Sequence, residues 1–401
     1  MADRFFPNEM LEFVPESSTT ATKDSLTNLL CVPYKTLSDT LKNSAFAIQQ
    51  TVVNETWGLS GNRVRDYSLY TGALGTAYLV FKAYQFNQNE THLKLCSHIV
   101  KACDSASTDS GHVTFICGRA GVCALGAVLA KHAGDERLLN HYLTQFKEIK
   151  LASDLPNELL YGRVGFLWAC TFLNKHIGKD TISTTRMRAV VDEIIKAGRR
   201  LANKGRCPLM YEWHGKKYWG AAHGLAGIMH VLMDMELKPD EVEDVKGTLR
   251  YMTKNRFPGG NFLSSEGSES DRLVHWCHGA PGITLTLVKA AQVFGDEEFL
   301  QAAVDAGEVS LFAPGWGLCT RGCPGKADHE LTQFKEIVLA SDLPNELLYD
   351  RLVHRCHGAP GITLTLVKAA QERWYGKGVS LSELASVMAS ACFSGTVPTD
   401  W

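Results

Sequence analysis

One stretch of the chain, HWCHGAPG at residues 275–282, places a thiol and two imidazoles beside a tight Gly-x-x-Gly turn. Thiolate and neutral imidazole are the ligands that Zn²⁺ prefers in proteins. An apolar run from Ile283 to Val288 follows at once, as expected of a helix that begins at the turn and gives the ligands a rigid base. The stretch is therefore a candidate zinc site. A purely structural role for the Cys-His pair is the alternative.

The same arrangement of a glycine turn followed by an apolar run occurs five times, and the first glycines are separated by 46, 44, 62 and 55 residues. A single turn of this kind would indicate helix capping and nothing more. Five in order indicate an internal repeat of stacked or ring-closed supersecondary units. The turns lie at residues 72–75, 118–121, 162–165, 224–227 and 279–282.

The segments between the turns predict amphipathic helices. Leu93, Cys96, Ile99, Val100 and Cys103 form one apolar stripe among polar neighbours. Alternating β-branched runs are scarce, so we predict an all-α protein. Apolar inner helices wrapped by amphipathic outer ones favour a two-layer α/α barrel, and the small turn residues would let the inner helix ends converge on one face of the ring.

Composition excludes several classes of function. The net charge of −2 provides no basic surface to attract nucleic acid or anionic lipid. The chain has no apolar run of about 18 residues, which a transmembrane helix would require. The N-terminus shows no signal-peptide pattern, and the twelve cysteines are scattered instead of forming a short disulfide framework. We expect a soluble protein of a reducing, intracellular compartment.

Five motifs resemble those of the LanC-like family, the eukaryotic relatives of bacterial lanthionine cyclases: LYTGALGTAYL, PNELLYGRVG, LMYEW, AAHGLAGI and LVHWCHGAPGI. The resemblance covers residues 1 to about 318, and the opening MADRFFPN resembles the plant branch. It implies an α/α toroid of seven helical hairpins with Zn²⁺ at one mouth of the ring. It also implies addition of a thiol, glutathione in the eukaryotic branch, to dehydroalanine or dehydrobutyrine residues of dehydrated proteins or peptides.

Three residues match functional positions of the family. His223 matches the active-site histidine and is the candidate acid or base, because the addition needs a proton donor for the enolate that forms. Cys277 matches the first zinc ligand. Arg4 matches a basic residue that binds glutathione in relatives, where a guanidinium could hold a carboxylate bidentately. The alternatives are a buried structural histidine, a structural cysteine and a solvated arginine.

The sixth turn departs from the family pattern. The family has a Cys-His pair there, which supplies the other two zinc ligands, whereas residues 317–325 read GLCTRGCPG. One alignment keeps Cys319 as a ligand, another keeps neither residue, and both lose the histidine. A second Cys-His pair, Cys356 and His357, follows later in the chain and could complete a Cys-Cys-His site with Cys277.

That second pair lies in copied sequence. Residues 331–350 repeat residues 143–162 with 18 of 20 identical, and residues 351–371 repeat residues 272–292 with 20 of 21 identical. Such identity indicates recent duplication, recombination or an error in the gene model. The copied segment could fold as a helical hairpin in the position of the sixth unit of the ring. Alternatively, it could pack only loosely against the rest of the toroid.

We therefore predict an N-terminal arm over residues 1–22, a LanC-like toroid over 23–318 and a rearranged part over 319–401. The sixth and seventh units of the toroid are expected to be degenerate.

The first functional hypothesis is a zinc-dependent enzyme that adds glutathione to dehydrated residues. The second is a non-catalytic binding or signalling relative, linked in plants to abscisic acid or G proteins. The third, by architecture alone, is a glycosidase or terpenoid cyclase. The cytoplasm is the expected location, with peripheral attachment at the plasma membrane as the alternative.

Overall fold

The computed structural model describes residues 34–61, 63–202 and 205–312. Within these ranges the regular structure is helical, with two isolated β-bridges and no strand, so the all-α prediction is confirmed. None of the helices in these ranges is long and apolar enough to cross a membrane. The predicted arm, Arg4, Cys319, Cys356 and His357 lie outside the described residues.

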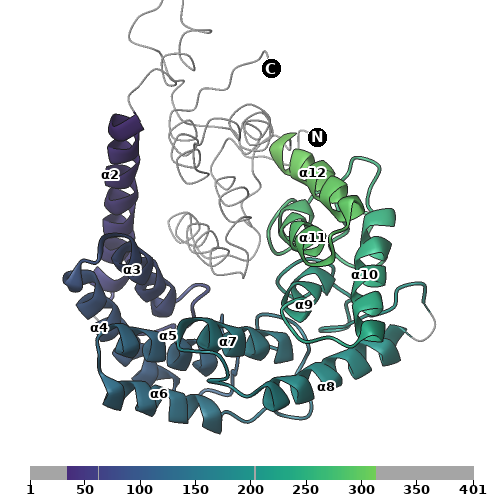
Figure 1. Ribbon diagram of the computed structural model, residues 1–401. Helices are drawn as coiled ribbons and strands as arrows, with labels where there is room; N and C mark the ends of the chain where they lie inside the picture. Colours follow the sequence, from purple (N-terminus) through teal and green to yellow (C-terminus); the bar gives the residue numbers. More distant parts are fainter. Residues whose placement is uncertain (1–33, 62, 203–204, 313–401) are drawn as a thin grey trace, which may run out of the picture.

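The helices alternate between an inner and an outer layer along a curved arc (Figure 1). The arc begins with α2 (Tyr34–Val53) and a π-helical turn, η1 (Asn54–Gly58). The inner helices are α3 (Ala73–Asn87), α5 (Arg119–His132), α7 (Arg163–His176), α9 (Leu225–Leu232) and α11 (Ala280–Phe294). The outer helices are α4 (Glu90–Ser107), α6 (Glu136–Glu148), α8 (Thr184–Ala202), α10 (Pro239–Lys254) and α12 (Glu297–Phe312).

Burial follows the two layers. In the inner helix α5 every residue from Ala120 to Ala130 is buried, because neighbours cover the helix on all sides. In the outer helix α6 only Leu139, Tyr142 and Phe146 are buried, one apolar stripe facing the inner layer. The described residues thus form five inner–outer hairpins of the predicted α/α barrel, and the sixth and seventh predicted units lie outside them.

The predicted glycine turns position the inner helices. The first glycine of each turn is the N-cap residue of an inner helix. At four of the turns a Cβ on the second glycine would overlap the backbone carbonyl oxygen of the residue six positions earlier. The loop before each helix therefore folds back against the first helical turn, and only glycine leaves room for it. These second glycines are Gly121, Gly165, Gly227 and Gly282.

This close approach predicts the cost of adding a single methyl group. Gly227→Ala is expected to lower the free energy of unfolding by about 1–3 kcal/mol, because its Cβ would overlap the carbonyl oxygen of Ala221, a backbone atom. Gly58→Ala is the matched control, since its nearest neighbour would be the Val53 carbonyl oxygen at an ordinary 3.6 Å. Chemical denaturation of both variants checks the prediction, and equal stabilities would contradict it.

The turns are joined to one another. The N–H of Leu69 donates to the carbonyl of Ile116 at 2.7 Å, and the N–H of Phe115 donates to the carbonyl of Gly165 at 3.0 Å. The ring of Tyr70, before the first turn, lies 6.2 Å from that of Trp276, before the fifth. The predicted convergence of the inner helix ends on one face is confirmed, and this face carries the candidate chemical residues.

Candidate functional site

His223 lies immediately before the N-cap of α9 and pairs with an acid from the previous turn. Its Nδ1 is 2.7 Å from Oε2 of Glu158, and the two side chains are 15% and 2% exposed. The pair joins the third and fourth turns, 65 residues apart in the chain. The predicted site residue is therefore paired with a buried acid and remains partly exposed itself.

The backbone holds Glu158 in place. Its carboxylate accepts hydrogen bonds from the N–H groups of Leu160, at 2.9 Å, and Tyr161, at 2.5 Å. A carboxylate that already accepts two backbone bonds takes the proton of His223 Nδ1 as a third, which selects one tautomer of the ring. Nε2 is then the imidazole nitrogen that can exchange a proton.

Aromatic rings surround His223. Trp213 stacks on the imidazole with ring centroids 3.9 Å apart and an angle of 14° between the planes. Tyr161 lies nearly parallel at 6.2 Å, and Tyr218 is tilted at 5.9 Å. Trp213 is held by a pair of backbone hydrogen bonds with Lys216. These rings restrict the orientation of the imidazole and shield it from water.

Cys277 lies on the fifth turn, next to the segment that leads to His223. The residue is buried, at 8% exposure, and its carbonyl oxygen approaches Gly220 so closely that a Cβ there would overlap it. The next residue, His278, has its ring 5.5 Å from that of Tyr218. Burial, and to a smaller degree the neighbouring His223 and Lys216, lower the pKa of His278 to about 4. Its imidazole is therefore neutral at pH 7.

The fifth turn differs from the other four in its backbone. Gly279 has a φ of 101°, a left-handed conformation that favours glycine. The N–H of Ala280 donates to Oδ1 of Asn261 at 2.9 Å, whereas the corresponding N–H of the other turns donates to a backbone carbonyl. Asn261 in turn donates to the carbonyl of Leu273 at 3.0 Å. This buried side chain shapes the turn that carries Cys277.

A second thiol near the site is unsuited to act as a nucleophile. Burial raises the pKa of Cys117 to about 12, and the nearby charge of Glu158 raises it further. Its side chain interacts with the hydroxyl of Tyr161. Cys117 is a protonated structural partner of Tyr161, so it does not compete with an incoming thiol.

Within the described ranges, two neighbouring side chains carry donor atoms of the types that zinc prefers. Cys277 offers a thiol, and Nδ1 of His278 is buried without a hydrogen-bond partner, so both donor types suit Zn²⁺. No group of three His, Cys, Asp or Glu residues that could hold a metal ion occurs within the described ranges. A complete site would therefore include residues from outside those ranges, where Cys319, Cys356 and His357 lie.

The sequence motifs point to His223 and Cys277 but not to most of the residues that surround them. Glu158 and Tyr161 lie in the PNELLYGRVG motif, and Trp213 lies in LMYEW. Both motifs entered the resemblance without a role for any single residue. An acid four residues before a glycine turn was the signal that could have drawn attention to Glu158.

Comparisons with known proteins agree with this architecture. A family model described as lanthionine synthetase C-like protein matches residues 63–313. The chain is 42% identical over 294 residues to the LanC-like protein GCL1 of Arabidopsis thaliana, an alignment that covers 68% of each chain. The chain belongs to the lanthionine synthetase C-like family.

Two further similarities concern the family and the fold. The chain is 36% identical over 294 residues to a Danio rerio protein named glutathione S-transferase LANCL1, covering 69% of this chain and 72% of the relative. The solved structure of nisin cyclase aligns with a TM-score of 0.55 and 14% identity, over 88% of this chain and 95% of that one. At that identity the similarity supports the fold alone, the all-α toroid.

Proposed function

We propose that this chain is a zinc-dependent enzyme that adds the thiol of glutathione to dehydroalanine or dehydrobutyrine residues in proteins or peptides. One observation carries the proposal, the pairing of the partly exposed His223 with the buried Glu158 on the face that also holds Cys277. Membership of the LanC-like family supports it, as does the name glutathione S-transferase given to one relative.

The addition requires a proton to be transferred from the thiol to the α-carbon of the dehydrated residue. The thiol sulfur forms a bond to the β-carbon of the alkene, the π bond breaks, and an enolate results. The proton released by the thiol must finally reach the α-carbon. Nε2 of His223 is the nitrogen that can carry this proton, while Glu158 stabilises the imidazolium form through Nδ1.

Of the residues proposed to bind zinc and glutathione, only Cys277 lies in the described ranges. When bound, Zn²⁺ lowers the pKa of a coordinated thiol so that it is ionised near neutral pH. Cys277 would hold the ion, together with ligands drawn from Cys319, Cys356 and His357. Arg4 is the proposed partner of a glutathione carboxylate. The proposed location is the cytoplasm, free or peripherally attached at the plasma membrane.

Metal analysis of the purified full chain tests the zinc part. About one equivalent of zinc is expected, and Cys277→Ala should lose it, because a zinc site needs its thiolate ligands. Cys319→Ala, Cys356→Ala and His357→Ala identify the remaining ligands by which of them lose metal. Cys170→Ala, at a buried position in α7, is the control that should keep it. A folded parent without zinc would contradict the proposal.

One observation favours a second function. Because residues 317–325 lack the Cys-His pair of the sixth family turn, a non-catalytic LanC-like binding or signalling protein is the alternative. In plants such a protein would act in abscisic-acid or G-protein signalling. A folded protein that binds no zinc and adds no thiol would support this alternative.

A further inference from the structure

Asn261 carries a buried amide, 1% exposed, in the loop between α10 and α11. Its Oδ1 accepts a hydrogen bond from the N–H of Ala280 at 2.9 Å. Its Nδ2 donates to the carbonyl of Leu273 at 3.0 Å and to Oδ1 of Asp271 at 2.9 Å. Both N–H groups and the oxygen of the amide are therefore used, which fixes the orientation of the side chain.

The amide of Asn261 separates two backbone groups that are joined directly in the other four turns. There the N–H of the residue after the first glycine donates to the carbonyl seven positions earlier, at 2.8–3.1 Å. These pairs are Ala73 with Asp66, Arg119 with His112, Arg163 with Pro156, and Leu225 with Tyr218. In the fifth turn the corresponding pair is Ala280 with Leu273, and the amide is bonded to both. The base of this loop is therefore wider by one amide group.

The widened loop has its own backbone conformation around Cys277. The N–H of His275 donates to the carbonyl of His278 at 2.8 Å, which closes a short turn with Cys277 inside it. Gly279 then has a φ of 101°, whereas the N-cap glycines of the other inner helices have φ between −101° and −132°. The backbone that carries Cys277 thus differs from that of every other turn in the described ranges.

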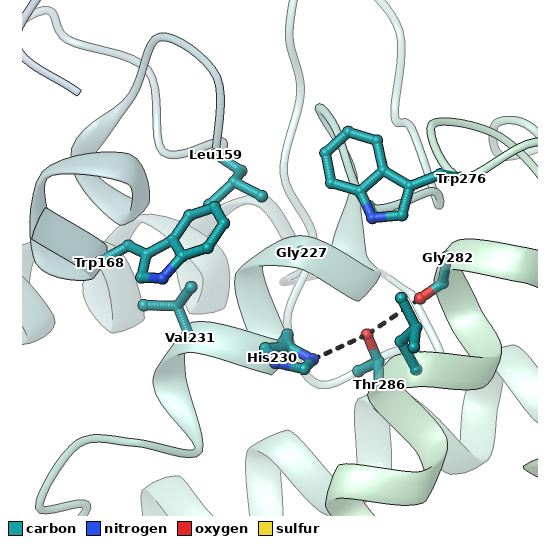
Figure 2. Close-up of a pocket in the computed structure, with 10 residues that line it drawn as sticks. Leu159, Trp168, Gly227, His230, Val231, Trp276, Gly282 and Thr286 are labelled. Carbon is teal, nitrogen blue, oxygen red and sulfur yellow. Dashed lines mark hydrogen bonds between the residues drawn. The ribbon is translucent and has the colours of Figure 1, made fainter. Parts of the chain in front are cut away.

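Packing holds the same loop at a second place. Trp276 lines a small cavity between α7, α9 and α11, together with Leu159 and Trp168 (Figure 2). The carbonyl oxygen of Trp276 accepts from the N–H of Ala221, in the fourth turn, at 3.4 Å. We expect these contacts to keep the loop folded when the amide of Asn261 is removed.

We propose that Asn261 is a positioning residue for zinc. By holding Leu273 and Ala280 apart, its amide fixes the loop that presents the thiol of Cys277 to the ion. The inference rests on the proposed function, which makes Cys277 a zinc ligand. Without the amide, the two backbone groups pair directly, as in the other turns, or are left without a partner. In both cases the loop around Cys277 changes.

The test is the zinc affinity of the purified full chain, measured by competition with a chromophoric chelator. Asn261→Ala should weaken zinc binding by about 10–100-fold, the usual effect of removing a side chain that orients a metal ligand. Circular dichroism establishes that the variant is folded.

Thr114→Val is the matched control. Thr114 is also fully buried, and its hydroxyl also bridges backbone groups of the turns. It donates to the carbonyl of Leu160 at 2.5 Å and accepts from the N–H of Cys117 at 3.1 Å. This variant should lose stability, because buried backbone groups lose their partner, but it should keep the zinc affinity of the parent.

A folded Asn261→Ala variant with the zinc affinity of the parent would overturn this inference alone, because Asn261 would then support only the fold. Should that variant not fold, Asp271→Ala keeps the amide but removes the acceptor of its other N–H. Unchanged zinc affinity in folded Asp271→Ala would likewise overturn the inference. A folded parent that binds no zinc would instead overturn the zinc part of the proposed function, and this inference with it.

Discussion

Replacing His223 with asparagine is expected to lower kcat for glutathione addition by about 10²–10⁴-fold, the range typical of a lost general acid or base. Asparagine has no group that exchanges a proton near pH 7. The fold should persist, because His223 retains 15% exposure and lies in a turn, not in the packed helix core. Steady-state kinetics, with zinc content and thermal unfolding measured on the same preparation, check this expectation.

Glu158 provides the companion experiment. Glu158→Gln keeps the shape of the side chain but removes the carboxylate charge beside Nδ1 of His223. This variant should therefore lower kcat while leaving the zinc content unchanged, since the imidazole loses the carboxylate that orients it. His141→Asn is the matched control, because that ring is 47% exposed and lies on the outer helix α6. A His223→Asn variant as active as the parent would show that the proton is carried by another group.

The second large effect concerns stability and comes from a buried ion pair. Nζ of Lys289, in α11, lies 2.6 Å from Oδ2 of Asp234, just after α9, and the side chains are 2% and 13% exposed. Burial lowers the pKa of Lys289 and raises that of Asp234, and in each case the partner's charge opposes the shift. Lys289→Met should lower the free energy of unfolding by about 3–5 kcal/mol, because it leaves a buried carboxylate unpaired.

A double-mutant cycle separates this effect from a loss of packing. Lys289→Met combined with Asp234→Leu removes both charges and should be markedly more stable than Lys289→Met alone. Lys246→Met is the control, since its pair with Glu243 at 3.4 Å lies at the surface, with side chains 23% and 68% exposed, and should contribute less than about 1 kcal/mol. Urea denaturation of the parent, Lys289→Met, Asp234→Leu and the double variant measures the cycle. A double variant no more stable than Lys289→Met would contradict the assignment.

The repeat of glycine turns and apolar helices could be predicted from the sequence alone, because each turn and its helix are formed by residues that are neighbours in the chain. A glycine at the N-cap and an apolar run behind it are neighbours in sequence, and helix periodicity depends on residues three and four positions apart. The five predicted turns at Gly72, Gly118, Gly162, Gly224 and Gly279 are the five inner-helix starts of the structure. Four of the five LanC-like motifs lie on these turns, the exception being LMYEW at residues 209–213, so the fold and the family followed largely from the same residues.

The pairing of side chains across the turns was decided only by tertiary structure. Glu158 and His223 lie 65 positions apart, and Lys289 follows an apolar run without any signal that it pairs with Asp234. Whether these side chains come into contact depends on how the inner helices pack and on how far each loop folds back. Neither property can be predicted from a local sequence pattern. The same packing produces a small cavity between α7, α9 and α11 that Trp276 helps to line. The sequence alone determined which residues begin the helices and that Cys277 and His223 belong to this face. Tertiary packing decided which acid orients His223, because hydrogen bonds between turns require atoms to meet within about 3 Å.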